Sequence, residues 1–276
     1  MKLGIFAKTF PGTSPLDVLR AAAEAGYSSV QYNMACSGIG ALPEHVSPQV
    51  VQAIKSASEE TGVEIAAISA TYNMIHPDVA LREAGRRSFE AIAAASNAIG
   101  SRLLTVCTGS RDPLDQWRHH PDNQGESAWT DMLLEFQAQL VIAERFDVLV
   151  GVEPELGNVV NSARRARTLI DTAGSDRIRI VFDPANLFET EEAPTRRLIV
   201  ENAIDLLKDR IEIAHAKDRN ADGNFATAGK GVLDYGHYLA ALEKAGFEGS
   251  LITHGLASGE AEGVAVFLKT TLSKGG

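Results

Sequence analysis

Short apolar runs alternate with longer amphipathic stretches from one end of the chain to the other. The short runs are rich in Val, Ile and Leu, which predicts buried strands, whereas the longer stretches repeat apolar residues at helical spacing. Eight such pairs can be counted along the sequence. The predicted strands are residues 3–7, 29–33, 64–70, 102–108, 148–154, 178–184, 211–217 and 250–256.

Helix boundary signals support the same division of the chain. In residues 14–26, Ser14 is placed to cap a helix, Pro15 suits its first position and Gly26 ends it. A regular alternation of strand and helix predicts parallel strands joined by right-handed crossovers. Eight units favour closure over an open sheet, so we expect an α/β fold, a (β/α)8 TIM barrel, as a single domain over residues 1–276.

The composition limits the partners of such a barrel. The chain has 36 acidic and 26 basic residues and a net charge of −10, whereas a nucleic-acid surface needs clustered Lys and Arg. No stretch reaches the roughly 20 apolar residues of a membrane helix, and the first apolar run is too short for a signal peptide. The separated Cys36 and Cys107 favour reduced, buried thiols. We expect a cytoplasmic protein that binds neither nucleic acid nor membrane.

Polar residues that can bind a cation end four successive predicted strands. These are Glu153, Asp183, His215 and His254. Singly, each is typical of a turn or of a satisfied core side chain. In a barrel, however, the carboxyl ends of successive strands lie side by side on one rim, so the four side chains are expected to converge. Two carboxylates and two imidazoles suit manganese, zinc, cobalt or iron(II) better than calcium.

The segments GVEPELGNVV, VFDPANLF and IAHAKDR, in this order, resemble the sugar-phosphate isomerase/epimerase superfamily of xylose-isomerase-like TIM barrels. The resemblance extends over essentially the whole chain. It implies that Glu153, Asp183 and His215 bind a divalent metal, most often manganese or magnesium. Two positions depart from the family pattern. His254 stands where catalytic members carry a second Glu, and Asn186 stands where sugar epimerases often place a substrate-binding His.

Other polar residues follow predicted strands at the same end of the barrel. Lys217 lies two residues beyond His215, so both side chains point inward if the strand is regular, where Lys217 holds a substrate oxyanion or an ion pair. Glu155 is either a second proton carrier or a solvated carboxylate, and His76 either binds substrate or caps the chain before Pro77. The full set of predicted substrate-binding residues is Lys8, Asn73, His76, Arg111, Trp117, Glu155, Asn186, Lys217 and Arg219.

Two loops stand out at this end. Residues 109–126 form a long connection after the fourth predicted strand, which is typical of a lid, a structural loop or a subunit contact. The run TAGKGVLDY contains Gly229 and Gly231 and predicts a backbone cradle or a plain turn.

The predicted site favours an isomerase or epimerase of a small sugar or sugar-derived hydroxy-carbonyl compound. A divalent cation would stabilise an enediolate, and Glu153 and His254 are the predicted catalytic groups. The alternatives are a metal-dependent lyase or decarboxylase acting on a sugar-derived keto acid, and a non-catalytic barrel that binds a ligand or serves as a partner subunit. The expected partner is a carbohydrate-like small molecule. The resemblance also implies that the protein forms a homo-oligomer.

Overall fold

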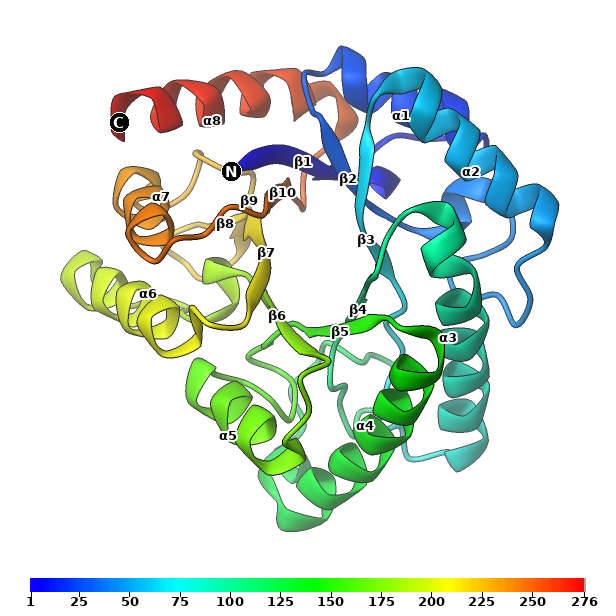
Figure 1. The fold of residues 1–276 in the computed structure, drawn as a ribbon. Coiled ribbons are helices and arrows are strands. Elements are labelled where there is room, and N and C mark those ends of the chain that lie inside the picture. Colours follow the sequence, from blue (N-terminus) through cyan, green and yellow to red (C-terminus); the bar gives the residue numbers. More distant parts are fainter. Residues whose placement is uncertain (276) are drawn as a thin grey trace.

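Eight parallel strands close into a barrel in the computed structural model, which describes residues 1–275 (Figure 1). Going around the barrel, the order is β1, β10, β7, β6, β5, β4, β3 and β2. The eight predicted strands and the TIM-barrel fold are therefore confirmed. The barrel strands are β1 (Lys2–Phe6), β2 (Ser29–Tyr32), β3 (Glu64–Ser69), β4 (Leu103–Val106), β5 (Leu149–Val152), β6 (Ile178–Phe182), β7 (Ile211–Ala216) and β10 (Ser250–Thr253).

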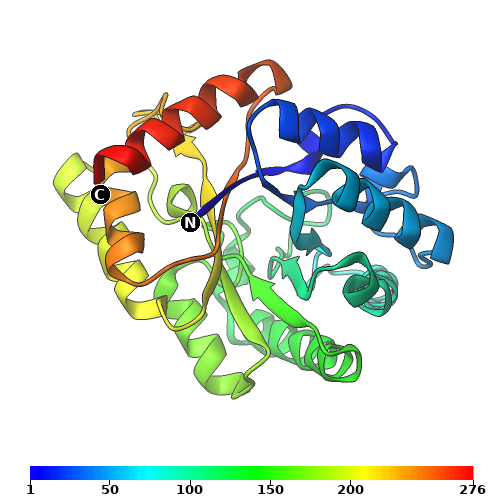
Figure 2. The ribbon, with the colours of Figure 1, turned by 45° about the horizontal axis from the view of Figure 1, so that its top comes forward.

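Helices form a ring outside these strands, as the tilted view in Figure 2 shows. They are α1 (Pro15–Glu24), α2 (Pro48–Thr61), α3 (Val79–Ile99), α4 (Glu126–Phe146), α5 (Ala163–Ala173), α6 (Ala193–Leu207), α7 (Tyr235–Lys244) and α8 (Ala261–Gly275). Short 3-10 helices are η1 (Ala7–Thr9), η2 (Met34–Ser37), η3 (Pro121–Gln124), η4 (Pro184–Asn186) and η5 (Ser258–Glu260). No helix in the described part of the chain is long and apolar enough to cross a membrane.

The boundaries of α1 follow the predicted signals. Ser14 accepts a hydrogen bond from the Asp17 backbone N–H, and Pro15 occupies the first turn. Gly26 follows the helix with φ of 94°, a conformation that glycine adopts without steric cost. The chain can therefore turn directly from α1 into β2.

Two layers of apolar packing support the barrel. Inside it, five buried residues form a separate cluster, and the larger core fills the space between strands and helices. Because this cluster is apolar, the polar groups at the carboxyl ends of the strands lie above a layer of packed hydrophobic side chains. The interior cluster consists of Ala67, Leu103, Val181, Ile213 and Ile252.

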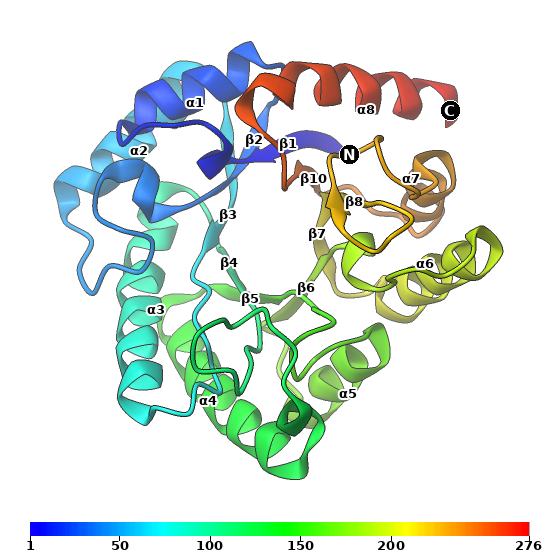
Figure 3. The same cartoon turned by 180° about the vertical axis from the view of Figure 1, so that it is seen from behind.

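A small antiparallel hairpin, not predicted from the sequence, follows β7. It pairs β8 (Asp218–Arg219) with β9 (Phe225–Ala226), and Figure 3 shows it at the same end of the barrel as the long β4–α4 connection. After the hairpin, the Asp218 carboxylate accepts hydrogen bonds from the backbone N–H groups of Gly229, Gly231 and Leu233. The glycine pair is therefore part of a turn wrapped around Asp218.

Candidate metal centre

Three side chains from successive strands converge at the mouth of the barrel. Glu153 follows β5, Asp183 follows β6 and His215 lies near the end of β7, and all three are buried. His215 Nδ1 lies 3.2 Å from Glu153 Oε1 and 3.5 Å from Asp183 Oδ2. One potential ligand atom from each residue lies within 4.8 Å of the other two. The predicted convergence of these three residues is therefore confirmed.

The donor atoms fit a divalent cation. Asp183 Oδ2 and His215 Nδ1 are both buried, and their contacts within the described chain are ion pairs with other groups of the site, not regular hydrogen bonds. Buried polar atoms normally have regular hydrogen bonds, so two atoms held only by ion pairs are candidates for binding a shared cation in their place. Two carboxylates and an imidazole form a ligand set typical of manganese, zinc or iron(II).

Lys217 and Asn186 complete the polar shell around the two carboxylates. Lys217 Nζ lies 3.0 Å from Asp183 Oδ2 and donates a hydrogen bond of 2.8 Å to Asn186 Oδ1. Asn186 Nδ2 in turn donates to Glu153 Oε1 at 3.0 Å. The structure thus gives Lys217 the ion pair that the sequence left as one of two alternatives, and it places Asn186 between the lysine and Glu153.

The site balances its own charge. Burial alone would raise the pKa of Asp183, but Lys217 and His215 outweigh it and hold that pKa well below its usual value. The pKa of Glu153 is lowered in the same way: burial would raise it, and the charge of His215 is the largest effect that lowers it. Burial works against a charged His215, yet Glu153 and Asp183 raise its pKa to about 9. Two carboxylates therefore face an imidazolium and an ammonium.

Glu155 behaves differently from its neighbour Glu153. Burial and the Glu153 charge raise the Glu155 pKa to about 8, so Glu155 keeps its proton near neutral pH.

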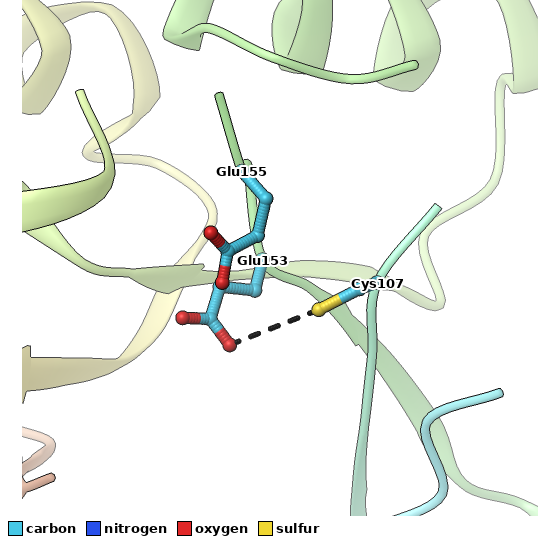
Figure 4. Close-up of side chains that lie close together, drawn as sticks. All are labelled: Cys107, Glu153 and Glu155. Carbon is cyan, nitrogen blue, oxygen red and sulfur yellow. Dashed lines mark hydrogen bonds between the residues drawn. The ribbon is translucent and has the colours of Figure 1, made fainter. Parts of the chain in front are cut away.

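Cys107 points from the end of β4 toward Glu153, as Figure 4 shows. Its sulfur lies 4.0 Å from Glu153 Oε2. Burial, and then Glu153, raises the pKa of the Cys107 thiol. Cys107 and Cys36 are both free and buried, as predicted.

His254 lies beside the centre without joining the group of close ligand atoms, which contains only Glu153, Asp183 and His215 among these four. Its ring stacks between two others, with centroids 5.3 Å from His215 and 5.2 Å from Phe6. Burial, and then the charge of His215, lowers its pKa to about 4. His254 is thus a neutral imidazole whose buried Nδ1 has no hydrogen-bond partner in the described chain.

Sequence reasoning missed Gln31, which reaches His215 from the other side of the barrel. Gln31 lies in β2 and is 5% exposed. Its Oε1 lies 2.9 Å from His215 Nε2, and its Nε2 donates to the hydroxyls of Ser69 and Thr105, each at 3.2 Å. The available signal was a lone amide between two large apolar residues in a predicted strand.

Several predicted substrate-binding residues hold the rim together. Asn73 Oδ1 accepts from the backbone N–H groups of Ile75 and Ser110, and His76 Nδ1 accepts from the Asp78 N–H. His76 therefore makes the capping contact that was its alternative role.

The predicted cationic residues of the rim differ in whether their side chains have partners. Arg111 pairs with Asp131 at 2.7 Å and donates to the Ile75 carbonyl. Buried Arg219 donates to the carbonyls of Ala185 and Gly223. Lys8, in contrast, is exposed and makes no side-chain hydrogen bond or ion pair within residues 1–275.

The long β4–α4 connection is fixed by buried amides. Asn123, fully buried, accepts from the Arg111 N–H and donates to Ser110 Oγ and the Gly157 carbonyl. A Cβ on Gly157 would lie 2.3 Å from the Trp117 carbonyl oxygen, so glycine allows the loop to approach. Trp117 itself is 47% exposed. These contacts favour a fixed wall over a mobile lid.

This barrel with a carboxylate–histidine cluster at its mouth matches the family model described as xylose isomerase-like TIM barrel over residues 19–266. The chain belongs to that family. No curated protein matches the chain.

Solved structures share its fold at low sequence identity. The 3-keto-D-glucoside 4-epimerase from E. coli has a TM-score of 0.77 at 17% identity, with 98% of this chain and 99% of that chain covered. An L-ribulose 3-epimerase has a TM-score of 0.75 at 15% identity, covering 99% and 96%. The D-psicose 3-epimerase from Clostridium cellulolyticum H10 has a TM-score of 0.74 at 14% identity, covering 100% and 98%.

Proposed function

We propose that this protein is a divalent-metal-dependent epimerase or isomerase of a small, unphosphorylated sugar or related hydroxy-carbonyl compound. The observation that carries the proposal is the buried cluster of Glu153, Asp183 and His215, in which one potential ligand atom of each residue lies within 4.8 Å of the other two. The sugar epimerases among the solved structures with this fold support the substrate class.

Glu153, Asp183 and His215 would hold the cation, with manganese the favoured ion and His254 a candidate fourth ligand. A divalent cation held there would stabilise negative charge on neighbouring substrate oxygens, as in an enediolate. The ionised Glu153 accepts a proton from the carbon beside the carbonyl. Glu155 is protonated near neutral pH and therefore returns a proton, whereas His254, with a pKa of about 4, carries none to give.

The charges at the rim support a neutral substrate. Lys217 is paired with Asp183, Arg219 is bound to backbone carbonyls and Arg111 is paired with Asp131. A phosphate needs cations whose donors are available to it. Because these three side chains are paired, Lys8 is the one predicted rim cation without a partner in residues 1–275, and this favours hydroxyl groups over a phosphate as the substrate's main polar contacts.

Metal content is the first test. Elemental analysis of the untagged protein is expected to find near-stoichiometric manganese or a similar ion in the wild type and its loss in Asp183→Ala. Asp222→Ala, which removes an exposed carboxylate from the hairpin turn, is the control and should keep the metal. His254→Ala decides whether imidazole contributes a fourth ligand. Absence of metal after reconstitution would refute the metal-dependent mechanism.

Turnover is tested in deuterated water with ketoses and oxidised sugars. Epimerisation through proton transfer places solvent deuterium on the inverted carbon, and Glu155→Gln should lower the rate by roughly 100-fold if Glu155 supplies that proton. Unchanged substrate across the panel with a metal-loaded protein would overturn the catalytic assignment and favour a ligand-binding barrel.

A lyase or decarboxylase is the second candidate. The observation that favours it is His254, a neutral imidazole beside the centre where catalytic relatives are expected to carry a second carboxylate. Such chemistry does not need two equivalent carboxylate proton carriers. Loss of water or carbon dioxide from a sugar-derived keto acid, detected by product mass, distinguishes it from epimerisation.

A further inference from the structure

The orientation of the His215 ring decides which of its nitrogens faces the carboxylates. Nδ1 lies 3.2 Å from Glu153 Oε1, whereas Nε2 points away from them and lies 2.9 Å from Gln31 Oε1. The two residues are 184 positions apart in sequence, and β1 and β10 lie between their strands. The contact therefore crosses the barrel interior.

We propose that Gln31 is the positioning residue that holds His215 with Nδ1 aimed at Glu153 and Asp183, by accepting a hydrogen bond from Nε2–H. This inference rests on the proposed metal centre and adds to it a residue from β2, on the other side of the barrel from β7. Gln31 touches neither carboxylate in the hydrogen-bond network of residues 1–275, so it acts through the imidazole.

The hydrogen count of the imidazole supports this role. When Nδ1 binds a cation through its lone pair, the ring's one hydrogen must lie on Nε2. When the cation is absent and the ring is an imidazolium, Nε2 carries a hydrogen as well. In both states the atom facing Nε2 has to be an acceptor, and the amide oxygen of Gln31 is the acceptor within reach.

The surroundings of Gln31 allow only a small range of positions for that oxygen. Its amide nitrogen is shared by Ser69 Oγ and Thr105 Oγ1, both at 3.2 Å and both buried. A hydroxyl can accept from an amide N–H and rotate to suit it. Two such anchors, from β3 and β4, fix the amide and so fix the ring of His215. Partners of this kind orient metal-binding histidines generally.

The test compares three variants of the full chain. Gln31→Met removes the acceptor at similar length, Gln31→Glu keeps an acceptor oxygen, and Ser29→Ala removes another buried barrel hydroxyl from β2 that bonds Ser250. Binding of Mn²⁺ alone, measured by calorimetry, is expected to weaken about 10- to 100-fold in Gln31→Met. It should stay within about threefold in Ser29→Ala, whereas Gln31→Glu, which keeps the acceptor and adds a negative charge, should bind Mn²⁺ at least as tightly as the wild type.

A spectroscopic signal reports the hydrogen bond directly and does not depend on turnover or on metal. In the metal-free wild type, ¹⁵N-labelled histidine should give a slowly exchanging Nε2–H signal for His215, which Gln31→Met loses and Ser29→Ala keeps. If Gln31→Met retains that signal, or binds Mn²⁺ as tightly as the wild type, the proposal is wrong. A wild type that keeps the protected N–H but binds no metal would instead refute the metal centre and leave the Gln31 contact standing.

Discussion

Lys217 Nζ lies 3.0 Å from Asp183 Oδ2, and both side chains are buried at the mouth of the barrel. The ammonium thus occupies a position beside a carboxylate that would also serve a divalent cation. Within a low-dielectric site, a like charge so close opposes cation binding while stabilising the carboxylate in the metal-free protein. The ion pair therefore stabilises Asp183 in the metal-free protein, and a cation has to compete with Lys217 for Oδ2.

Replacing Lys217 by Met should separate these two effects. The variant leaves Asp183 without its nearest cation, so the metal-free protein is expected to lose about 3 kcal/mol of unfolding free energy. Urea denaturation with and without Mn²⁺ measures this, and saturating Mn²⁺ should restore much of the loss. Lys230→Met, which removes an exposed lysine paired with Glu260, is the control and should change little. A Lys217→Met variant as stable as the wild type without metal would contradict the ion-pair role.

Metal affinity should rise with pH. The two carboxylates raise the His215 pKa to about 9, so a cation must displace a proton at neutral pH. The apparent affinity for Mn²⁺ is therefore expected to increase by about tenfold per pH unit from pH 6.5 and to level off near pH 9. Calorimetry in two buffers of different ionisation enthalpy should detect about one released proton at pH 7 and only about a quarter of a proton at pH 9.5. A pH-independent affinity would show that His215 is neutral before binding.

The metal-free protein should lose stability as the solution becomes alkaline. The His215 pKa is raised from 6.5 to about 9 and the Glu155 pKa from 4.5 to about 8. Both groups hold their protons more tightly when folded, so their contribution is complete below the unfolded pKa values and is lost as pH rises through the folded ones. The free energy of unfolding from urea titrations should fall between pH 5 and pH 9.5, by roughly 3 kcal/mol for His215 alone. In Glu155→Gln the fall should be smaller.

Asn123 is expected to stabilise the long β4–α4 connection more than its place in a loop suggests. Asn123→Ala leaves the Arg111 N–H and the Gly157 carbonyl without their partner, which should cost about 2 kcal/mol. Trypsin cleavage after Arg118, whose side chain is 58% exposed, should become faster in this variant. Asn224→Ala, in the exposed hairpin turn, is the matched control. Equal cleavage rates in both variants and the wild type would show that the loop is held by other contacts.

Local sequence patterns determined the barrel and the three converging residues. Each strand is a short apolar run followed by a helical repeat, and a closed parallel barrel brings the carboxyl ends of neighbouring strands together. Glu153, Asp183 and His215 could therefore be predicted as neighbours from their position at the ends of β5, β6 and β7. The β8–β9 hairpin escaped prediction because two residues per strand are too few to produce a periodic signal.

Only the tertiary structure decided how each polar group is satisfied. Gln31 meets His215 across the barrel, Lys217 pairs with Asp183, and Asn123 ties loop residues that lie far from one another in sequence. Such contacts depend on distances of about 3 Å between segments whose separation is set by the packing of the whole barrel. The sequence by itself determined which residue types reach the mouth of the barrel, because strand order follows from local alternation. Their partners, protonation states and free donor atoms were decided by the closed fold, because hydrogen bonds and buried charges respond to angstrom-scale geometry that no local pattern encodes.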